Sequence, residues 1–231
     1  DEEQSMYLQL MLSHGIDALV LCIANDSDKS LATLQAFEEN GIPVVAFDRY
    51  ADGMKCPLVA TDNEESARAL VQYLVDSGHK RIACISEPNH KNYSSRLAGY
   101  KRALADNGLE YDAQLVRAGD YRYESGYTLA GELLACHPTA IFACNDMMAY
   151  GVYKAVAEMG LKIPDEISVV GFDDLMFSET LAVALTTVKQ DIDGMCDKIC
   201  SLVSEALDGT NDRNHYMFAA TTVYRDSVKR L

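Results

Sequence analysis

The order of apolar and polar segments constrains the fold of this chain most strongly. Along most of its length, a short apolar run is followed by a polar loop and an amphipathic stretch of 10–15 residues. This alternation favours a parallel α/β sheet, and apolar runs without polar alternation are typical of strands covered on both faces. The expected strands are Ile16–Ala24, Ile42–Phe47, Pro57–Thr61, Arg81–Ser86, Gln114–Arg117, Ala140–Cys144, Ile167–Gly171 and Ala184–Val188, with a longer one near Tyr216–Tyr224.

Helix signals lie between these runs. Asn63 precedes Glu64 and Glu65, which places acidic residues in a first helical turn, and Gly78 follows as a stop signal. No repeat or Gly/Ser/Pro-rich linker marks a domain boundary, so two lobes would be joined by short crossovers. The final segment, Asp226–Leu231, turns polar and basic and is expected to fray.

Composition narrows the class of protein. A chain of 231 residues with 48% hydrophobic content can bury one large core or two ordinary ones. The net charge of −15 disfavours binding of this segment to nucleic acid, because nonspecific affinity for phosphate comes from Lys and Arg. No apolar run approaches the roughly 18 residues of a membrane span, and the acidic first residues do not resemble a signal peptide. We therefore expect a soluble protein without a membrane partner.

The seven cysteines indicate a reducing compartment. Their number is odd, and Cys22, Cys84 and Cys144 lie inside apolar runs, so reduced thiols in a cytoplasmic protein are expected. Cys196 and Cys200 are one helical turn apart and would suit a metal pair, but no second Cys or His pair has zinc-like spacing. Neither a metal nor another cofactor is expected.

Polar side chains follow several expected strands where those strands end. In open parallel sheets, ligands bind beyond the carboxyl ends of the strands. Carboxylates, an amide and a guanidinium at one sheet edge suit a ligand rich in hydroxyl groups, and a tyrosine could stack on a sugar ring. The candidates are Asp48, His90, Asn92, Arg96, Tyr121, Asn145, Asp146, Asp173 and Asp174.

Structural roles compete with ligand binding at several of these positions. Asp146 fits a helix N-cap as well as a ligand contact. Spacing alone slightly favours a surface ion pair for Arg96, and Tyr121 and Tyr123 could be packing residues. These positions by themselves predict only a protein that binds a polar ligand.

Sequence signatures of common enzymes are absent. The chain has no G-x-G-x-x-G, G-x-x-x-x-G-K-[ST], G-x-S-x-G or H-E-x-x-H motif. The five histidines are scattered, and His79 lies at a helix-to-strand turn where a structural role is expected. We predict that the chain is not an enzyme.

Six motifs follow one another along the last two thirds of the chain: SGHKRIACIS, SSRLAGYKRALADNGL, GDYRYESGY, AIFACNDMMAYGVYKAVAEMGLKIPDEISVVGFDD, ALTTVKQ and VYRDS. In their order and spacing, they resemble the effector-binding core of the LacI/GalR family of transcription regulators. The resemblance extends from near Ile42 to Ser227.

The resemblance implies a periplasmic-binding-protein-like fold of two doubly wound parallel-sheet lobes. Residues 1–61 and 190–220 would form the N-terminal lobe, and residues 63–188 and 222–231 the C-terminal lobe. Three crossovers would join them near Asp62-Asn63, Lys189-Gln190 and Thr221-Thr222. Relative to the family, the sequence lacks the DNA-binding helix-turn-helix and the first strand and helix of the N-terminal lobe, so DNA binding is expected of a parent protein.

The family places its effector, a small molecule, in the cleft between the lobes. Arg96 in SRLAGY and Asp173 in GFDD are the principal candidates, because family position and strand-end geometry agree on them. Purine-responsive members carry Arg where His90 stands here, which favours a sugar or sugar derivative. The other positions that the family uses are Asn145, Tyr121, His90 and Asn92, with Asp48 as a weaker candidate.

The family mechanism implies that the effector closes or reorients the lobes of a homodimer and so controls operator DNA binding. One alternative is a periplasmic sugar receptor of a transporter, which shares the fold. Another is a small-molecule enzyme on a doubly wound sheet. A helix-turn-helix or a signal sequence before this segment would separate the first two, and turnover of a bound sugar would establish the third.

Overall fold

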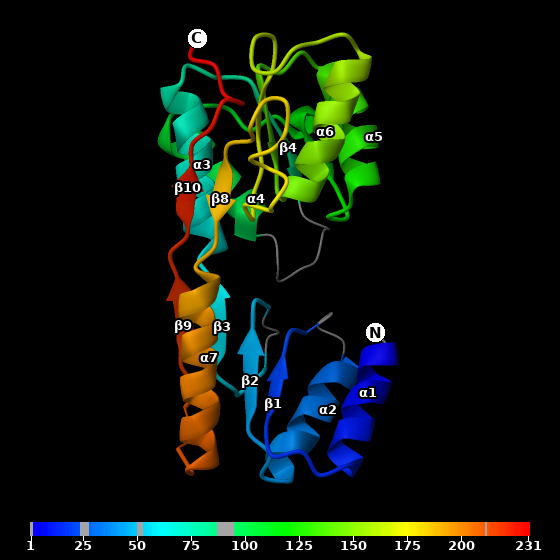
Figure 1. Cartoon of the computed structure of the whole chain (residues 1–231), viewed down its shortest axis with the longest axis vertical. Coiled ribbons are helices and arrows are strands. Elements are labelled where there is room, and N and C mark those ends of the chain that lie inside the picture. The colour runs from blue at the N-terminus through cyan, green and yellow to red at the C-terminus, as the bar shows by residue number, and fades with distance from the viewer. Residues whose placement is uncertain (1, 24–27, 50–52, 87–94, 211) are drawn as a thin grey trace. The chain divides into compact units, whose positions relative to one another are not determined.

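The chain folds into two compact units. The computed structural model describes residues 2–23, 28–49, 53–86, 95–210 and 212–231. The first unit comprises Asp1–Thr61 and Asp191–Phe218, and the second comprises Asp62–Gln190 and Ala219–Leu231. Each unit is built around its own parallel sheet (Figure 1), so the predicted α/β organisation is confirmed.

The first unit contains a four-stranded sheet in the order β1-β2-β3-β9, with every neighbouring pair parallel. Helix α7 packs on β2 and β3, where its buried Met195 and Leu202 meet Val45 and Val59. Helices α1 and α2 pack against each other beside the sheet (Figure 1). The elements are α1 (Glu2–Ser13), β1 (Leu19–Leu21), α2 (Asp28–Glu39), β2 (Val44–Phe47), β3 (Leu58–Thr61), α7 (Ile192–Leu207) and β9 (His215–Phe218).

The second unit contains a parallel sheet in the order β5-β4-β6-β7 and a separate antiparallel pair of β8 and β10. Helices α3 and α4 pack together, as do α5 and α6, and β4 contacts both α4 and α5. All residues of β4 and β6 are buried, as the apolar runs predicted. The elements are α3 (Asn63–Asp76), β4 (Ile82–Ser86), α4 (Ser95–Asp106), the short 3₁₀ helix η1 (Ala113–Leu115), β5 (Val116–Ala118), α5 (Tyr123–Leu134), β6 (Ala140–Ala143), α6 (Asp146–Glu158), β7 (Ser168–Val170), β8 (Thr187–Lys189) and β10 (Thr221–Val223).

Helix α4, which carries Arg96, is seated closely on α3. A Cβ atom added at Gly99 would lie 2.2 Å from the carbonyl oxygen of Glu64 on α3, so this contact requires glycine. One residue later, the Tyr100 hydroxyl donates to the carbonyl of Ile82 on β4 at 2.8 Å. The motif SRLAGY therefore fixes the position of α4 on both a helix and a strand.

Two expectations about the C-terminal part are wrong. The single strand expected near Tyr216–Tyr224 is two strands, because β9 pairs in parallel with β3 whereas β10 pairs antiparallel with β8. The final segment, Asp226–Leu231, is anchored rather than frayed. Ser227 is fully buried, the Lys229 amide donates to Ser168 Oγ at 3.0 Å, and the Leu231 amide donates to the Ser77 carbonyl at 2.8 Å.

Candidate ligand-binding site

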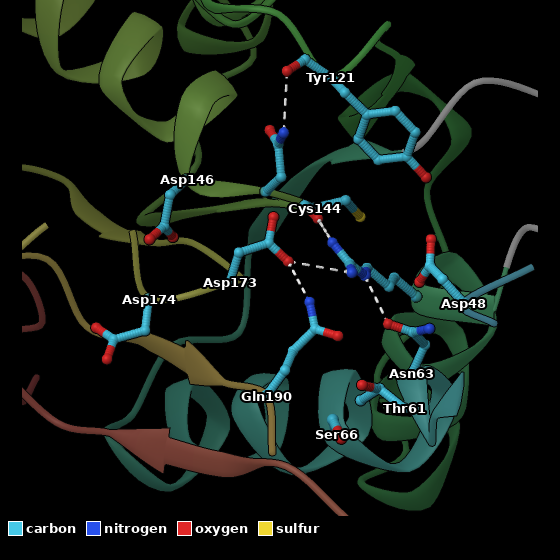
Figure 2. A network of polar contacts seen from close by, with 12 residues as sticks. Asp48, Thr61, Asn63, Ser66, Tyr121, Cys144, Asp146, Asp173, Asp174 and Gln190 are labelled. Atoms are coloured by element: carbon cyan, nitrogen blue, oxygen red, sulfur yellow. Dashed lines mark hydrogen bonds and ion pairs between the residues drawn. The ribbon is translucent and has the colours of Figure 1, made fainter. Parts of the chain in front are cut away.

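Polar residues of the second unit gather where its parallel strands end. Tyr121 follows β5, Asn145 follows β6, Asp173 follows β7, and Arg96 lies in the first turn of α4, the helix after β4. Because β5, β4, β6 and β7 run parallel, their carboxyl ends share one edge of the sheet. Figure 2 shows Tyr121, Cys144 and Asp173 in this region, together with Asn63 and Gln190.

The Arg96 guanidinium is at the centre of the contacts at this edge. Its Nε donates to Asn63 Oδ1 at 2.8 Å, and its Nη1 donates to the Cys144 carbonyl at 2.5 Å. The guanidinium carbon lies 3.7 Å from the centre of the Phe172 ring. With its side chain only 11% exposed, Arg96 is held in a defined orientation rather than extended into solvent as a surface charge.

Asp173 faces this guanidinium. Its Oδ1 lies 3.2 Å from Arg96 Nη2 and accepts a hydrogen bond from Gln190 Nε2 at 2.9 Å. The Asp173 backbone has a φ of 109°, and its amide donates to the Val188 carbonyl at 2.9 Å. The Asp173 side chain is 23% exposed, so part of its carboxylate is accessible. The acid that pairs with Arg96 is thus the other principal candidate.

Asn145 serves the structure of the site. It caps α6, since its Oδ1 accepts from the Met148 amide at 2.9 Å, and its Nδ2 donates to the Tyr121 carbonyl at 2.9 Å. Tyr121 has a φ of 67°, and its partly buried side chain packs against the core of the second unit. Asn145 therefore holds the backbone that presents Tyr121.

Asp146 is not the N-cap of α6, because Asn145 takes that position. Asp146 is fully buried. Its Oδ1 accepts from the Thr187 hydroxyl at 2.6 Å, and its Oδ2 accepts from the Ser178 hydroxyl at 2.5 Å and the Leu175 amide at 2.8 Å. Burial raises the pKa of this carboxyl, and these three hydrogen bonds act in the opposite direction. Asp146 ties the segment after Asp174 to β8.

The remaining candidates belong to the first unit or fall outside the described residues. Asp48 belongs to the first unit and directly follows β2. Its Oδ2 is 3.7 Å from Arg49 Nε and 3.9 Å from Cys22 Sγ, and burial together with this carboxylate raises the pKa of the Cys22 thiol. His90 and Asn92 lie outside the described residues.

Sequence reasoning missed three side chains around Arg96 and Asp173. Asn63 and Gln190 supply hydrogen-bond partners, and Phe172 supplies a stacking face. The acids after Asn63 indicated a helix start there, but Asp62 is the actual cap, with its Oδ1 accepting from the Glu65 amide at 3.0 Å. The only available signal for Asn63 and Gln190 was their place next to the predicted crossovers.

His79 has the structural role predicted for it. The ring is 1% exposed, with Nδ1 3.0 Å from the Thr139 hydroxyl and Nε2 3.0 Å from the Lys229 carbonyl. It connects the turn before β4 to the C-terminal segment.

Within the described ranges, His, Cys, Asp and Glu side chains form no group of three or more suited to a metal ion. Cys196 and Cys200 are both exposed on α7. In the part of the chain that the structure covers, no helix combines the length and the apolar content that crossing a membrane requires.

The chain is similar to transcription regulators of known identity. Residues 71–228 match a family model described as a periplasmic binding protein-like domain. The probable HTH-type transcriptional repressor ExuR of Bacillus subtilis (strain 168) is 32% identical over 222 residues, covering 93% of this chain and 65% of ExuR. The HTH-type transcriptional repressor PurR of Vibrio campbellii (strain ATCC BAA-1116) is 27% identical over 234 residues, covering 100% of this chain and 70% of PurR.

Solved structures agree with this similarity. A complex of the transcriptional regulator CelR with cellobiose matches with a TM-score of 0.87 at 30% identity, covering 98% of this chain and 69% of the CelR chain. The predicted periplasmic-binding-protein-like fold is confirmed. This chain spans just under two thirds of the length of ExuR. ExuR and PurR are transcriptional repressors, in agreement with the prediction that this chain is not an enzyme. The chain therefore belongs to the periplasmic binding protein-like family and is an effector-binding domain of the LacI/GalR type.

Proposed function

We propose that this chain is the effector-sensing part of a LacI-type DNA-binding transcription regulator and that its effector is a small sugar or sugar derivative. The observation that supports this most directly is the Arg96–Asp173 pair, 3.2 Å apart at the strand ends of the second unit. Asn63, the Cys144 carbonyl and Gln190 hold the two side chains, and the Phe172 ring stacks on the guanidinium.

The chemistry of this pair suits hydroxyl groups. A guanidinium only donates hydrogen bonds and a carboxylate only accepts them, so together they match neighbouring hydroxyls that do both. The two charges cancel, which favours a ligand without a large net charge. Tyr121, presented by Asn145, supplies an aromatic ring at the same sheet edge. The family resemblance implies contacts from His90, Asn92 and Asp48 as well, and these stay predictions.

The proposal extends to the whole protein. ExuR and PurR are HTH-type repressors, so we assign operator DNA binding to a helix-turn-helix in the parent protein rather than to this acidic segment. A homodimer fits an operator with two-fold symmetry, and cytoplasmic location fits the same role. In this scheme the two compact units are the two lobes, and the effector acts through its differential affinity for their arrangements.

A purine is the second candidate effector, because the family that the chain resembles has purine-responsive members and PurR matches 100% of this chain at 27% identity. The experiment therefore screens sugars, sugar phosphates and purines by thermal shift. A ligand that binds only the folded state at 100 times its Kd stabilises by about 2.7 kcal/mol, which raises the melting temperature by about 5–10 °C for a chain of this size.

The screen is repeated with Arg96→Ala and Asp173→Ala. Arg102→Ala is the matched control, because Arg102 lies on the same helix but is exposed and pairs with Glu64 and Glu65. We expect one sugar to stabilise the wild type and the control but neither site variant. Stabilisation by a purine alone, or by no compound, contradicts the sugar assignment, and stabilisation of both site variants by the sugar contradicts the site.

A further inference from the structure

Two adjacent residues of the site have left-handed backbones. Asp173 has a φ of 109° and Asp174 a φ of 51°. Residues other than glycine rarely adopt such backbone conformations, and these conformations persist only where surrounding contacts stabilise them. The chain therefore needs contacts that keep this pair of residues in place, and the direction of the Asp173 carboxylate depends on those contacts.

The two carboxylates have different partners. Asp173 is bound by Arg96 and Gln190, whereas Asp174 Oδ1 accepts from Arg225 Nη2 at 2.7 Å. Figure 2 shows the Asp173 carboxylate directed towards Gln190 and the Asp174 carboxylate directed away from it. The Arg225 and Asp174 side chains are only 16% and 15% exposed, so this ion pair is largely shielded from solvent.

Arg225 is itself firmly held. Its Nη1 donates to the Leu185 carbonyl at 2.9 Å, and its amide donates to the Thr186 hydroxyl at 2.9 Å. The same segment is fastened at Ser227, whose hydroxyl oxygen accepts from the Thr186 amide at 2.8 Å. The planar guanidinium thus connects two fixed points, the carbonyl before Thr186 and the carboxylate beside Asp173.

We propose that Arg225 is a positioning residue of the effector site. By holding Asp174 in its left-handed conformation, Arg225 sets the backbone of Asp173 and so the direction in which that carboxylate meets the effector. The expected effect of Arg225 on effector affinity rests on the proposed function, but its expected effect on the backbone is independent of any ligand. The VYRDS motif, which contains Arg225 and is far from Asp173 in sequence, would thus contribute to effector affinity.

The first test measures amide hydrogen exchange by NMR in the ligand-free chain. The variants are Arg225→Gln, Asp174→Asn and the double variant, with Ser227→Ala as the matched control because it removes a different bond of the same segment. Exchange rates are compared after correction for the change in the free energy of unfolding of each variant. On this scale we expect exchange at the amides of Asp173 and Leu175 to rise at least about tenfold in the first three variants and by less than about twofold in the control. Asp174→Asn is nearly isosteric, so the test stands even if Arg225→Gln does not fold.

Non-additivity distinguishes positioning from a general loss of stability. If Arg225 acts through Asp174, the double variant will exchange no faster than the faster single variant. Additive effects, or equal acceleration in Ser227→Ala, would show that the segment only stabilises the fold and would overturn the proposal.

The second test measures the affinity of cellobiose, the sugar bound to CelR, and of any compound that stabilises the wild type in the thermal-shift screen. For a compound that binds the wild type, the substitutions Arg225→Gln and Asp174→Asn should raise the Kd of that compound by about tenfold. Ser227→Ala should raise it by less than about twofold. An unchanged Kd in the first two variants overturns the positioning role. If no compound binds the wild type, the proposed function fails, while the exchange experiment still decides whether Arg225 positions Asp173.

Discussion

Asp173 of the second unit and Asp48 of the first unit occupy similar positions in the sequence, but other side chains hold their carboxylates to different degrees. Each follows an apolar strand, and each has a positive φ, 109° for Asp173 and 61° for Asp48. Asp173 is bound at 3.2 Å by Arg96 and at 2.9 Å by Gln190. The contacts of Asp48 with Arg49 and Cys22 are longer, at 3.7 and 3.9 Å, and one of these partners is its neighbour in the chain.

The difference shows that a strand-end acid is held in a fixed orientation when side chains from other segments bind it. In the second unit, the partners of the Asp146, Asp173 and Asp174 carboxylates come from β8, α4 and the C-terminal segment. Charged groups that are shielded from solvent require such partners, because an unpaired buried charge is strongly destabilising. Removing a partner should therefore cost much more in the second unit than around Asp48.

The largest effect is expected for Asp146→Ala. Its buried carboxylate accepts three hydrogen bonds, and the substitution would leave the three donors without this acceptor. The free energy of unfolding should therefore fall by about 3–5 kcal/mol. The matched change in the first unit, Asp48→Ala, should cost no more than about 0.5 kcal/mol. Urea unfolding followed by circular dichroism measures both free energies of unfolding, and similar losses would contradict the expected difference between the two acids.

Arg96→Ala should lower the free energy of unfolding by about 2–3 kcal/mol even without ligand. The substitution removes the partner of Asp173 and leaves the Cys144 carbonyl without this donor. Arg49→Ala is the control, since the Arg49 and Asp48 side chains are 35% and 37% exposed and such pairs contribute little. Equal unfolding midpoints for Arg96→Ala and wild type would contradict this prediction.

Ser227→Ala should cost about 1–2 kcal/mol, because the buried Thr186 amide would lose its acceptor. Ser204→Ala on α7, at an exposed position of the first unit, should change the unfolding midpoint very little. The urea midpoints of the two variants measure how much the C-terminal segment contributes to the stability of the second unit. Equal midpoints for Ser227→Ala and the wild type would contradict this prediction.

The smallest effect concerns pH. Burial lowers the pKa of His79 below its ordinary value of 6.5, so the unfolded chain takes up this proton more readily than the folded one. The contribution of His79 to stability is therefore present above pH 6.5 and is lost as the pH falls through the lowered pKa. Melting temperatures between pH 7.5 and 5.5 should decrease more steeply for the wild type than for His79→Gln, and parallel decreases would count against this role.

Much of the fold could be predicted because it is encoded locally. Apolar runs and helical stripes reflect how each segment meets its own layer, so the described strands overlap the predicted ones. The exception, near Tyr216–Tyr224, arises because pairing partners decide where a strand ends, and β9 and β10 pair with different sheets. Composition also misjudged Asp226–Leu231, since its anchors, Ser77, His79 and Ser168, are distant in sequence.

Strand-end position and motif order are properties of the linear chain, so the parallel α/β class and the family could be predicted from the amino-acid sequence. For the same reason, Arg96 and Asp173 could be proposed from it as the principal candidates. The contacts of each polar group were found only in the folded protein: Asn145 caps a helix and holds Tyr121, Asp146 is buried, and Arg225 binds Asp174. A hydrogen bond depends on the distance and direction between two atoms, and for residues far apart in sequence these are fixed only when the helices and strands pack together.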